Sequence, residues 1–225
     1  MKKTSKVILL IDKPKGVTSH DVVDEVRRKT GERRVGHAGT LDPNATGLLI
    51  VGVGRESTKR LGEIAKNTTK TYEAQIVLGE ERETDDPEGR RLPISNFQFP
   101  NKSKIAKSQI LKTLNSFVGE QMQTPPAYSA IKIKGKPAYK LARKGVALKL
   151  EPRRVTIYEL ELIKYSYPLL FATCRVSSGT YIRALARDIG RKLGTGAYLK
   201  NLRRTKIGDY SVTDALELKK YTQSV

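Results

Sequence analysis

The chain has 225 residues and a formal net charge of +20, and its 38% hydrophobic and 29% charged residues can supply both a packed core and a hydrated surface. This composition excludes a disordered tail, a coiled coil and a collagen-like repeat. A single cysteine, Cys174, excludes a disulfide framework and a cysteine-based zinc site, and two histidines leave little room for a histidine-rich metal centre. No apolar run approaches the ~20 residues of a membrane span, and no export signal is evident, so we expect a cytoplasmic protein.

Hydrophobic periodicity predicts a mixture of strands and helices without regular strand–helix–strand spacing. The predicted strands cover residues 7–11, 48–53, 69–78, 129–134, 155–163 and 170–176. The predicted helices cover residues 19–29, 55–66, 108–117, 137–144 and 180–193, and Gly31, Gly119 and Gly145 mark the ends of three of them. The pattern favours an α+β fold with a mixed, mainly antiparallel sheet, in a single domain over residues 1–225.

Positive charge is concentrated in two stretches of the sequence. Residues 132–154 carry nine basic side chains and one acid, and residues 183–206 carry eight basic side chains and one acid. Residues 80–90 show the opposite bias, with six acids and two arginines. Long stretches of one sign favour a polyanionic partner, of which nucleic acid is the first choice; an anionic membrane surface or simple solubility is the alternative.

The most unusual segment is residues 34–49, where three glycines, His37, Asp42 and Pro43 lie in a loop that leads into an apolar strand. Such a loop can place the Asp42 carboxylate at a strand edge, in a cleft. Alternatively, Asp42 caps an ordinary turn and His37 is a hydrogen-bonding loop residue. The segment lacks the Gly-Lys-Ser/Thr ending of a phosphate-binding loop.

Two further positions could carry function. Tyr72 lies on the apolar face of its predicted strand, which it shares with Ala74, Ile76 and Leu78, so a core aromatic is the alternative there. Arg183 follows Tyr181 where a strand gives way to a helix, and a helix N-terminus suits an anion. The alternative for Arg183 is a solvated helix face, in line with Arg187 and Arg191 and beside an apolar stripe.

These residues lie within motifs that resemble those of the TruB-type tRNA pseudouridine synthases. The motifs appear in the order and spacing of that family and span most of the chain: residues 12–19 (DKPKGVTS), 36–47 (GHAGTLDPNATG), 70–74 (KTYEA), 123–132 (QTPPAYSAIK), 179–183 (GTYIR) and 199–207. The resemblance implies a pseudouridine synthase-type sheet with helices packed around a central cleft.

The resemblance also implies roles for individual residues. It makes Asp42 the catalytic residue, and Arg183 the partner that would keep this carboxylate charged and oriented. Tyr72 would pack on the target base, with His37, Tyr181 and Leu202 completing the substrate contacts. The implied reaction converts uridine 55 in the T loop of tRNA to pseudouridine, for which no cofactor or metal need be invoked.

The expected partner is therefore the T stem-loop of tRNA, with no membrane association, no obligate protein partner and a monomeric state. Six basic residues are predicted, more weakly, to contact RNA phosphates: Lys132, Lys134, Lys136, Arg203, Arg204 and Lys206. The target uridine must be flipped out of its stack, and a tyrosine face can receive it.

Two departures and two alternatives accompany this interpretation. Members of the family usually carry a C-terminal PUA module, which we do not expect in this chain, either because this member lacks it or because the sequence has been shortened. Residues 81–86 replace the usual Thr-Asp-Thr pattern, which leaves any role of that loop in doubt. The alternatives are a guide-RNA-directed synthase subunit of the dyskerin type and a catalytically silent RNA-binding module. The bacterial-like run at residues 123–130 argues against the first, and the presence of Asp42, Tyr72 and Arg183 argues against the second.

Overall fold

The computed structural model describes residues 7–93, 105–133, 135–146 and 148–219. The chain forms two compact units, of which unit 1 comprises residues 1–73 and 201–225 and unit 2 comprises residues 74–200. Two strands contribute residues to both units: β4 (Lys70–Leu78) and β10 (Ala197–Ile207). The single domain over residues 1–225 stays a prediction.

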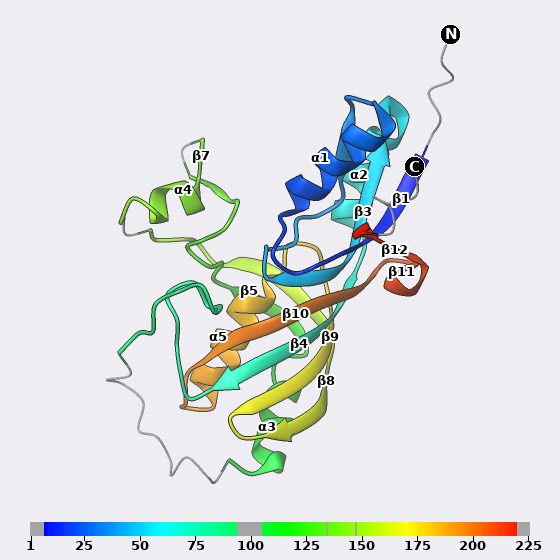
Figure 1. Ribbon diagram of the computed structural model, residues 1–225. Helices are drawn as coiled ribbons and strands as arrows, with labels where there is room; N and C mark the ends of the chain where they lie inside the picture. Colours follow the sequence, from blue (N-terminus) through cyan, green and yellow to red (C-terminus); the bar gives the residue numbers. More distant parts are fainter. Residues whose placement is uncertain (1–6, 94–104, 134, 147, 220–225) are drawn as a thin grey trace. The chain divides into compact units, whose positions relative to one another are not determined.

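Unit 1 is built around one long strand, β3, which carries three partners (Figure 1). The other elements of unit 1 are β1 (Val7–Lys13), α1 (Ser19–Thr30), β2 (Val35–His37), β3 (Ala45–Val53), α2 (Arg55–Asn67), β11 (Tyr210–Ser211), the 3-10 helix η1 (Val212–Asp214) and β12 (Leu216–Glu217). One edge of β3 pairs with β1, antiparallel over residues 47–53. Its other edge pairs with β10 over residues 45–47 and with β2 over residues 51–53. The segment 38–44 leaves the sheet at the end of β2, where His37 faces Val51, and rejoins it at Ala45, where β3 begins to pair with β10.

Both faces of β3 are buried, which explains its continuous apolar sequence. Leu49, Val51 and Val53 lie in one core cluster, together with the inward valines of α1. Leu48 and Ile50 lie in a second cluster, together with Leu61 of α2. Because successive side chains of a strand point to opposite faces, β3 separates the two clusters and connects α1 to one of them and α2 to the other.

Helix α1 begins and ends as its sequence predicts. Thr18 caps its N-terminus in a reciprocal capping box with Asp21, and Gly31 ends it at φ 66°. The predicted inward residues Val22, Val23 and Val26 are all buried.

Among its described residues, unit 2 contains the sheet strands β4, β9, β8 and β5, in that order, the first residues of β10 and three helices. Its remaining elements are α3 (Lys107–Asn115), β5 (Gly119–Gln123), β6 (Lys132–Ile133), β7 (Lys136–Pro137), α4 (Ala138–Ala142), β8 (Arg153–Ser166), β9 (Leu169–Val176) and α5 (Ile182–Lys192). Strand β8 is antiparallel to both β9 and β5, and β6 and β7 form a separate two-stranded hairpin. The predicted mixed, mainly antiparallel sheet is confirmed, whereas the central cleft stays a prediction.

Strand β10 is the largest element that the sequence pattern does not predict. Its 11 residues include Lys200, Arg203, Arg204 and Lys206, and this run of charge hides the strand period. Within residues 129–133 of the strand predicted at residues 129–134, only the two residues of β6 form a strand. Among the described residues, no helix is long and apolar enough to cross a membrane.

Gly47 is expected to tolerate no side chain. Its φ is +101°, and a Cβ atom there would collide with the carbonyl oxygen of Arg204 and lie 2.7 Å from the backbone nitrogen of the same residue. Because these atoms belong to paired strands, none of them can move away cheaply. We expect Gly47→Ala to lower the free energy of unfolding by at least about 2 kcal/mol in urea titrations.

Gly62 provides the control, because it lies inside α2 and an added Cβ atom would meet nothing within 4 Å. Gly62→Ala is expected to raise the free energy of unfolding by about 0.5–1 kcal/mol. Equal effects of the two substitutions would contradict the close approach at Gly47.

Candidate active-site residues

The segment 38–44, with Asp42 at its centre, is fixed in unit 1 on both sides of the carboxylate. Before Asp42, the backbone N–H of Leu41 donates to Ser19 Oγ at 2.9 Å, and this hydroxyl donates to the Leu41 carbonyl at 3.1 Å. After it, the carbonyl of Pro43 accepts from the backbone N–H of Gly16 at 2.9 Å. The Asp42 carbonyl also accepts from Ala45 N at 3.0 Å, so the predicted turn does form. Asp42 therefore forms the predicted turn and is also held in place on both sides, so the two interpretations of this residue do not exclude each other.

A buried lysine lies directly beneath this segment. Lys13 is 0% exposed, and its Nζ donates to the carbonyls of Pro14 at 2.9 Å, Val17 at 2.8 Å and Pro43 at 3.3 Å. These three bonds use all three donors of an ammonium group. Burial lowers the pKa of Lys13 to about 8, the negative charge of Asp42 opposes this shift, and the positive charge of Arg204 adds to it. At neutral pH Lys13 is therefore mainly charged, and it places a positive charge near Asp42.

Arg204 holds the same segment from β10, and its position corrects one prediction. The side chain is 1% exposed; Nε donates to the Leu48 carbonyl at 2.8 Å and Nη2 to the Gly39 carbonyl at 3.0 Å. A guanidinium enclosed in this way does not reach the surface, so the predicted phosphate contact by Arg204 is wrong for this structure. Arg204 joins β10 to Gly39 of the Asp42 segment and to Leu48 of β3.

The other predicted phosphate contacts of unit 1 differ in their availability. Arg203 forms a bidentate ion pair with Asp12, at 3.1 and 2.6 Å, and retains a side-chain exposure of 38%. Lys206 is exposed. Both stay predictions, and Lys134 lies outside the described residues.

The register of unit 1 places three more predicted residues. Leu202 pairs with Ala45, three residues beyond Asp42. Tyr72 is 8% exposed on the buried face of β4, and Thr205 Oγ1 of β10 donates to the carbonyl of the preceding Thr71 at 3.3 Å. His37 ends β2, and its Nδ1 is buried without a hydrogen-bond partner among the described residues. Burial lowers the pKa of His37, helped by the charge of Arg204, so this imidazole is neutral at neutral pH.

Unit 2 contains the predicted Tyr181 and Arg183, at the start of α5. Arg183 is only 6% exposed, which excludes a solvated helix face. Its Nη1 donates to the Thr84 carbonyl at 2.9 Å and lies 3.4 Å from Asp86 Oδ2, while Nη2 donates to the Tyr128 carbonyl at 3.1 Å. Tyr181 is half-buried, and its backbone forms two hydrogen bonds with the side-chain amide of Gln123, at 2.9 and 3.1 Å. The guanidinium of Arg183 is thus held in one orientation by fixed acceptors.

The arginines that follow Arg183 on α5 do not form the free basic face that their spacing suggests. Arg187 pairs with Asp85 at 2.9 Å and Arg191 pairs with Glu81 at 2.8 Å. The acidic segment of residues 80–91, to which the sequence pattern gives no role, therefore neutralises much of the second basic stretch.

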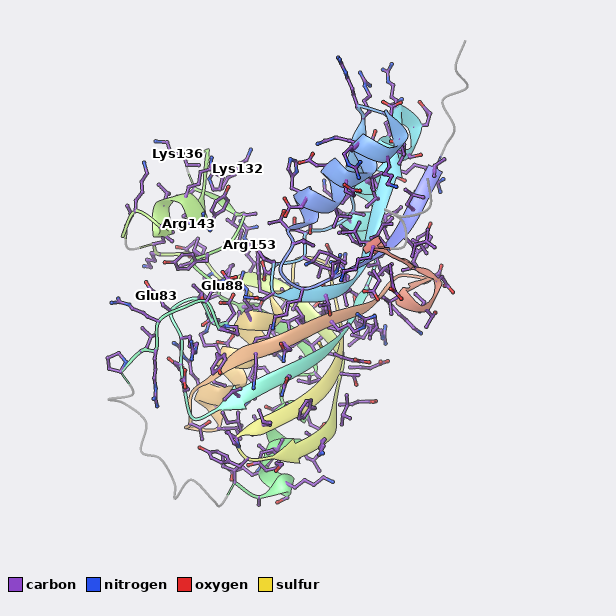
Figure 2. All side chains as sticks on the ribbon, in the orientation of Figure 1. Glu83, Glu88, Lys132, Lys136, Arg143 and Arg153 are labelled. Carbon is purple, nitrogen blue, oxygen red and sulfur yellow. The ribbon has the colours of Figure 1, made fainter. Side chains whose placement is uncertain are left out.

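The first basic stretch, in contrast, carries several basic side chains that are exposed to solvent. Lys132, Lys136 and Arg143 are exposed on the β6–β7 hairpin and just beyond α4, where Figure 2 shows their side chains projecting from this segment. We call residues 132–144 the basic hairpin. It also carries exposed Lys140 and Lys144, and it contains no acidic residue. Solvent-facing positive charge is therefore concentrated here rather than on α5.

Sequence reasoning misses the buried cations of unit 1. Besides Lys13 and Arg204, Lys70 is buried, and its Nζ donates to the carbonyls of Ala65 at 2.6 Å and Thr68 at 3.0 Å. Burial lowers the pKa of Lys70 to about 8. Lys13 and Lys70 each lie at the end of a strand and within one of the sequence motifs, and this position is the one feature of the sequence that could have indicated their burial. Among the described residues, no group of three or more His, Cys, Asp or Glu side chains is placed to hold a metal ion.

Comparison with known proteins assigns the chain to a family. Residues 27–182 match the model of the TruB family pseudouridylate synthase N-terminal domain, and residues 183–224 match that of the tRNA pseudouridylate synthase B C-terminal domain. The tRNA pseudouridine synthase B of Desulfotalea psychrophila is 47% identical over 214 residues, which cover 93% of this chain and 85% of that protein. That of Aquifex aeolicus is 43% identical and is matched over 96% of this chain and 73% of its own length.

Solved structures show a related fold. A "Cbf5-Nop10-Gar1 Complex" chain is 25% identical, with a TM-score of 0.71, and is matched over 96% of this chain and 53% of its own length. A chain from an H/ACA RNP bound to a substrate RNA containing 2'-deoxyuridine gives 24% identity and a TM-score of 0.70, with 52% of its length covered. This chain thus spans about half of each of those structures. The motifs, the fold and the sequence matches agree, and the chain belongs to the TruB family of pseudouridylate synthases.

Proposed function

We propose that the chain converts uridine 55 in the T loop of tRNA to pseudouridine and that Asp42 is its catalytic carboxylate. The observation that carries this proposal is the position of Asp42 between Leu41, which is hydrogen-bonded to Ser19 of α1, and Pro43, which is hydrogen-bonded to Lys13 of β1. A carboxylate held in this way, in a family of pseudouridylate synthases, suits a reaction that needs a precisely placed charged group.

The reaction is an isomerisation, so no oxidant or reductant is consumed. The bond between N1 of uracil and C1′ of ribose breaks, the base turns, and C5 bonds to C1′ in its place. C5 releases its proton and N1 gains one. Asp42 acts either as a nucleophile on the ribose or as a base that helps to form a glycal-like intermediate.

The environment of Asp42 suits both roles. The Lys13 ammonium, whose pKa of about 8 keeps it mainly charged at neutral pH, supplies positive potential near the carboxylate. It has no spare donor, because its three N–H groups are already bonded to carbonyls. Lys13 therefore supports the charge of Asp42 without competing as a proton donor.

Tyr72 and His37 are proposed to receive the extruded nucleotide. Flipping a base out of an RNA stack costs a few kcal/mol, which stacking on an aromatic ring offsets by about 1–3 kcal/mol. Tyr72 would provide that ring. The lowered pKa of His37 favours a neutral contact in the space that the base vacates over an ion pair with a phosphate.

Asp42→Asn and Asp42→Ala are expected to reduce single-turnover formation of pseudouridine in a T stem-loop transcript by at least about 1,000-fold, because the reacting charge is lost. RNA affinity should change little, since a carboxylate makes no favourable contact with phosphate. Mapping of pseudouridine after incubation with the pure protein measures the first quantity, and filter binding measures the second. Near-normal turnover by either variant would refute the assignment of Asp42.

Tyr72→Phe is expected to keep the stacking face and hence RNA affinity, and to slow turnover only if the phenol hydroxyl accepts a proton. Tyr72→Leu should reduce both, with affinity falling by about 1–3 kcal/mol. A tritium-release assay on transcripts labelled at C5 of uridine gives the rate. Unchanged affinity of Tyr72→Leu would contradict the stacking role.

Removing charge from the basic hairpin should weaken RNA binding and its salt dependence together. For Lys132→Gln with Lys136→Gln, we expect the slope of log affinity against log salt to fall by roughly 0.7–0.9 for each phosphate that is no longer neutralised. The matched control is Arg187→Gln, because this arginine is already ion-paired within unit 2 and should leave the slope unchanged. A flat salt response of the unaltered protein would argue against an electrostatic RNA footprint.

The same assays separate the two alternatives. Modification of a bare T stem-loop by the pure protein would exclude a requirement for a guide RNA or a protein partner. RNA binding without release of tritium would instead indicate a silent binding module.

A further inference from the structure

The segment of residues 80–91, which we call the acidic loop, lies along α5 in a fixed register. Three arginines one helical turn apart each face a different acid of the loop. The pairs are Arg183 with Asp86, Arg187 with Asp85 and Arg191 with Glu81. Since like charges at this spacing on a helix repel one another, each arginine needs its own counter-charge. A shift of the acidic loop along α5 would break all three ion pairs at once.

Asp85 occupies the central position, with a positive φ that is uncommon among residues other than glycine. Its φ is +60°, and among the described non-glycine residues no other has a positive φ. The side chain is buried, with Oδ2 at 2.9 Å from Arg187 Nη1. The Asp85 carbonyl accepts from Leu199 N of β10 at 2.9 Å. Asp85 therefore fastens the acidic loop to two elements of unit 2.

The two neighbours of Asp85 in the chain are the residues of the loop that hold Arg183. The Thr84 carbonyl accepts from Arg183 Nη1 at 2.9 Å, and the Asp86 carboxylate lies 3.4 Å from the same atom. Any rotation of the backbone at Asp85 moves both contacts. The orientation of the Arg183 guanidinium thus depends on how Asp85 is seated.

We propose that Asp85 is a positioning residue for the reaction: its ion pair with Arg187, assisted by Glu81 and Arg191, sets the register of the acidic loop and thereby the orientation of Arg183. This inference rests on the proposed function, because it takes Arg183 to act in the catalytic site. It assigns to the acidic loop the role that its departure from the family pattern leaves open.

Burial of Asp85 works against its charge, while the arginines of α5 favour it. Burial raises the pKa of Asp85 to about 6, while the facing Arg187, Arg183 and Arg191 oppose this rise and Asp188 adds to it. Because the pKa of this acid is higher in the folded chain, its ionised form is disfavoured by folding. The contribution of Asp85 to stability is thus favourable at low pH and is lost as the pH rises through about 6. A charge kept at neutral pH against this cost, on a backbone with positive φ, indicates a functional constraint.

The test compares Asp85→Asn with Glu83→Gln, both isosteric and both on the acidic loop. Glu83 pairs with Arg90 of the same loop rather than with an arginine of α5, so its variant should match the unaltered protein. For Asp85→Asn at neutral pH, assayed at a temperature where both variants stay folded, we expect single-turnover pseudouridine formation to slow by about 10- to 100-fold, with RNA affinity unchanged. A normal rate for Asp85→Asn would overturn the proposal, and so would a rate loss that merely follows a lowered melting temperature.

Exchanging the charges of Glu81 and Arg191 provides a second, independent test. Arg191→Glu alone, which places two acids together, should slow the reaction, and Glu81→Arg alone should do the same with two cations. The double variant Glu81→Arg/Arg191→Glu restores an opposite pair in the same register and should recover most of the rate. Failure of the double variant to recover, in a folded protein, would contradict a role of this pair in setting register.

A measurement on the protein without RNA tests the positioning of Arg183 independently of the proposed function. In protein labelled with isotopic arginine, NMR signals of the guanidinium group of Arg183, assigned with Arg183→Lys, should shift in Asp85→Asn and stay unchanged in Glu83→Gln. If the unaltered protein forms no pseudouridine but the signals shift as expected, the proposed function fails and the positioning of Arg183 stands. If the signals do not move, the positioning proposal fails whatever the activity.

Discussion

The structure of unit 1 depends on buried cations that donate to backbone carbonyls. Lys13 and Arg204 come from opposite ends of the sequence, and between them they bond to the carbonyls of Gly39, Pro43 and Leu48, around Asp42. A buried ammonium or guanidinium costs free energy unless it is hydrogen-bonded, and here backbone carbonyls accept hydrogen bonds from both side chains. The same bonds that make these charges tolerable fix the path of the Asp42 segment.

The net charge of the chain does not show which basic side chains are available to a partner. The formal charge of +20 indicates a polyanionic partner, but the positive side chains are not equivalent. Arg183, Arg187 and Arg191 are engaged by the acidic loop, and Arg204 is enclosed. Lys132, Lys136 and Arg143 of the basic hairpin are instead exposed to solvent. Basic side chains thus divide into those with partners inside the fold and those that face solvent, and only burial and partners distinguish the two groups.

Local rules account for the elements that the sequence predicts well. The capping box at Thr18 and the left-handed Gly31 place α1 within a residue or two, and the period of two places Tyr72, Ala74, Ile76 and Leu78 on one buried face of β4. Strand β10 is missed because charged residues lie on both of its faces, so its sequence shows no alternation of apolar and polar residues. Its pairing with β3 is parallel and joins residues 156 or more positions apart, a partnership that no local pattern reports.

The sequence by itself determines the family motifs, the α+β class and the identity of Asp42 as the residue to examine, because these follow from short segments whose chemistry and spacing are local. The tertiary structure alone decides what each charge does. Arg183 and Thr84 are 99 positions apart, and Arg187 and Asp85 are 102 apart, yet each pair is in hydrogen-bond contact. The energy of a charged group is set by its burial and by the partner that the fold brings to it, and neither quantity is encoded in its neighbours along the chain.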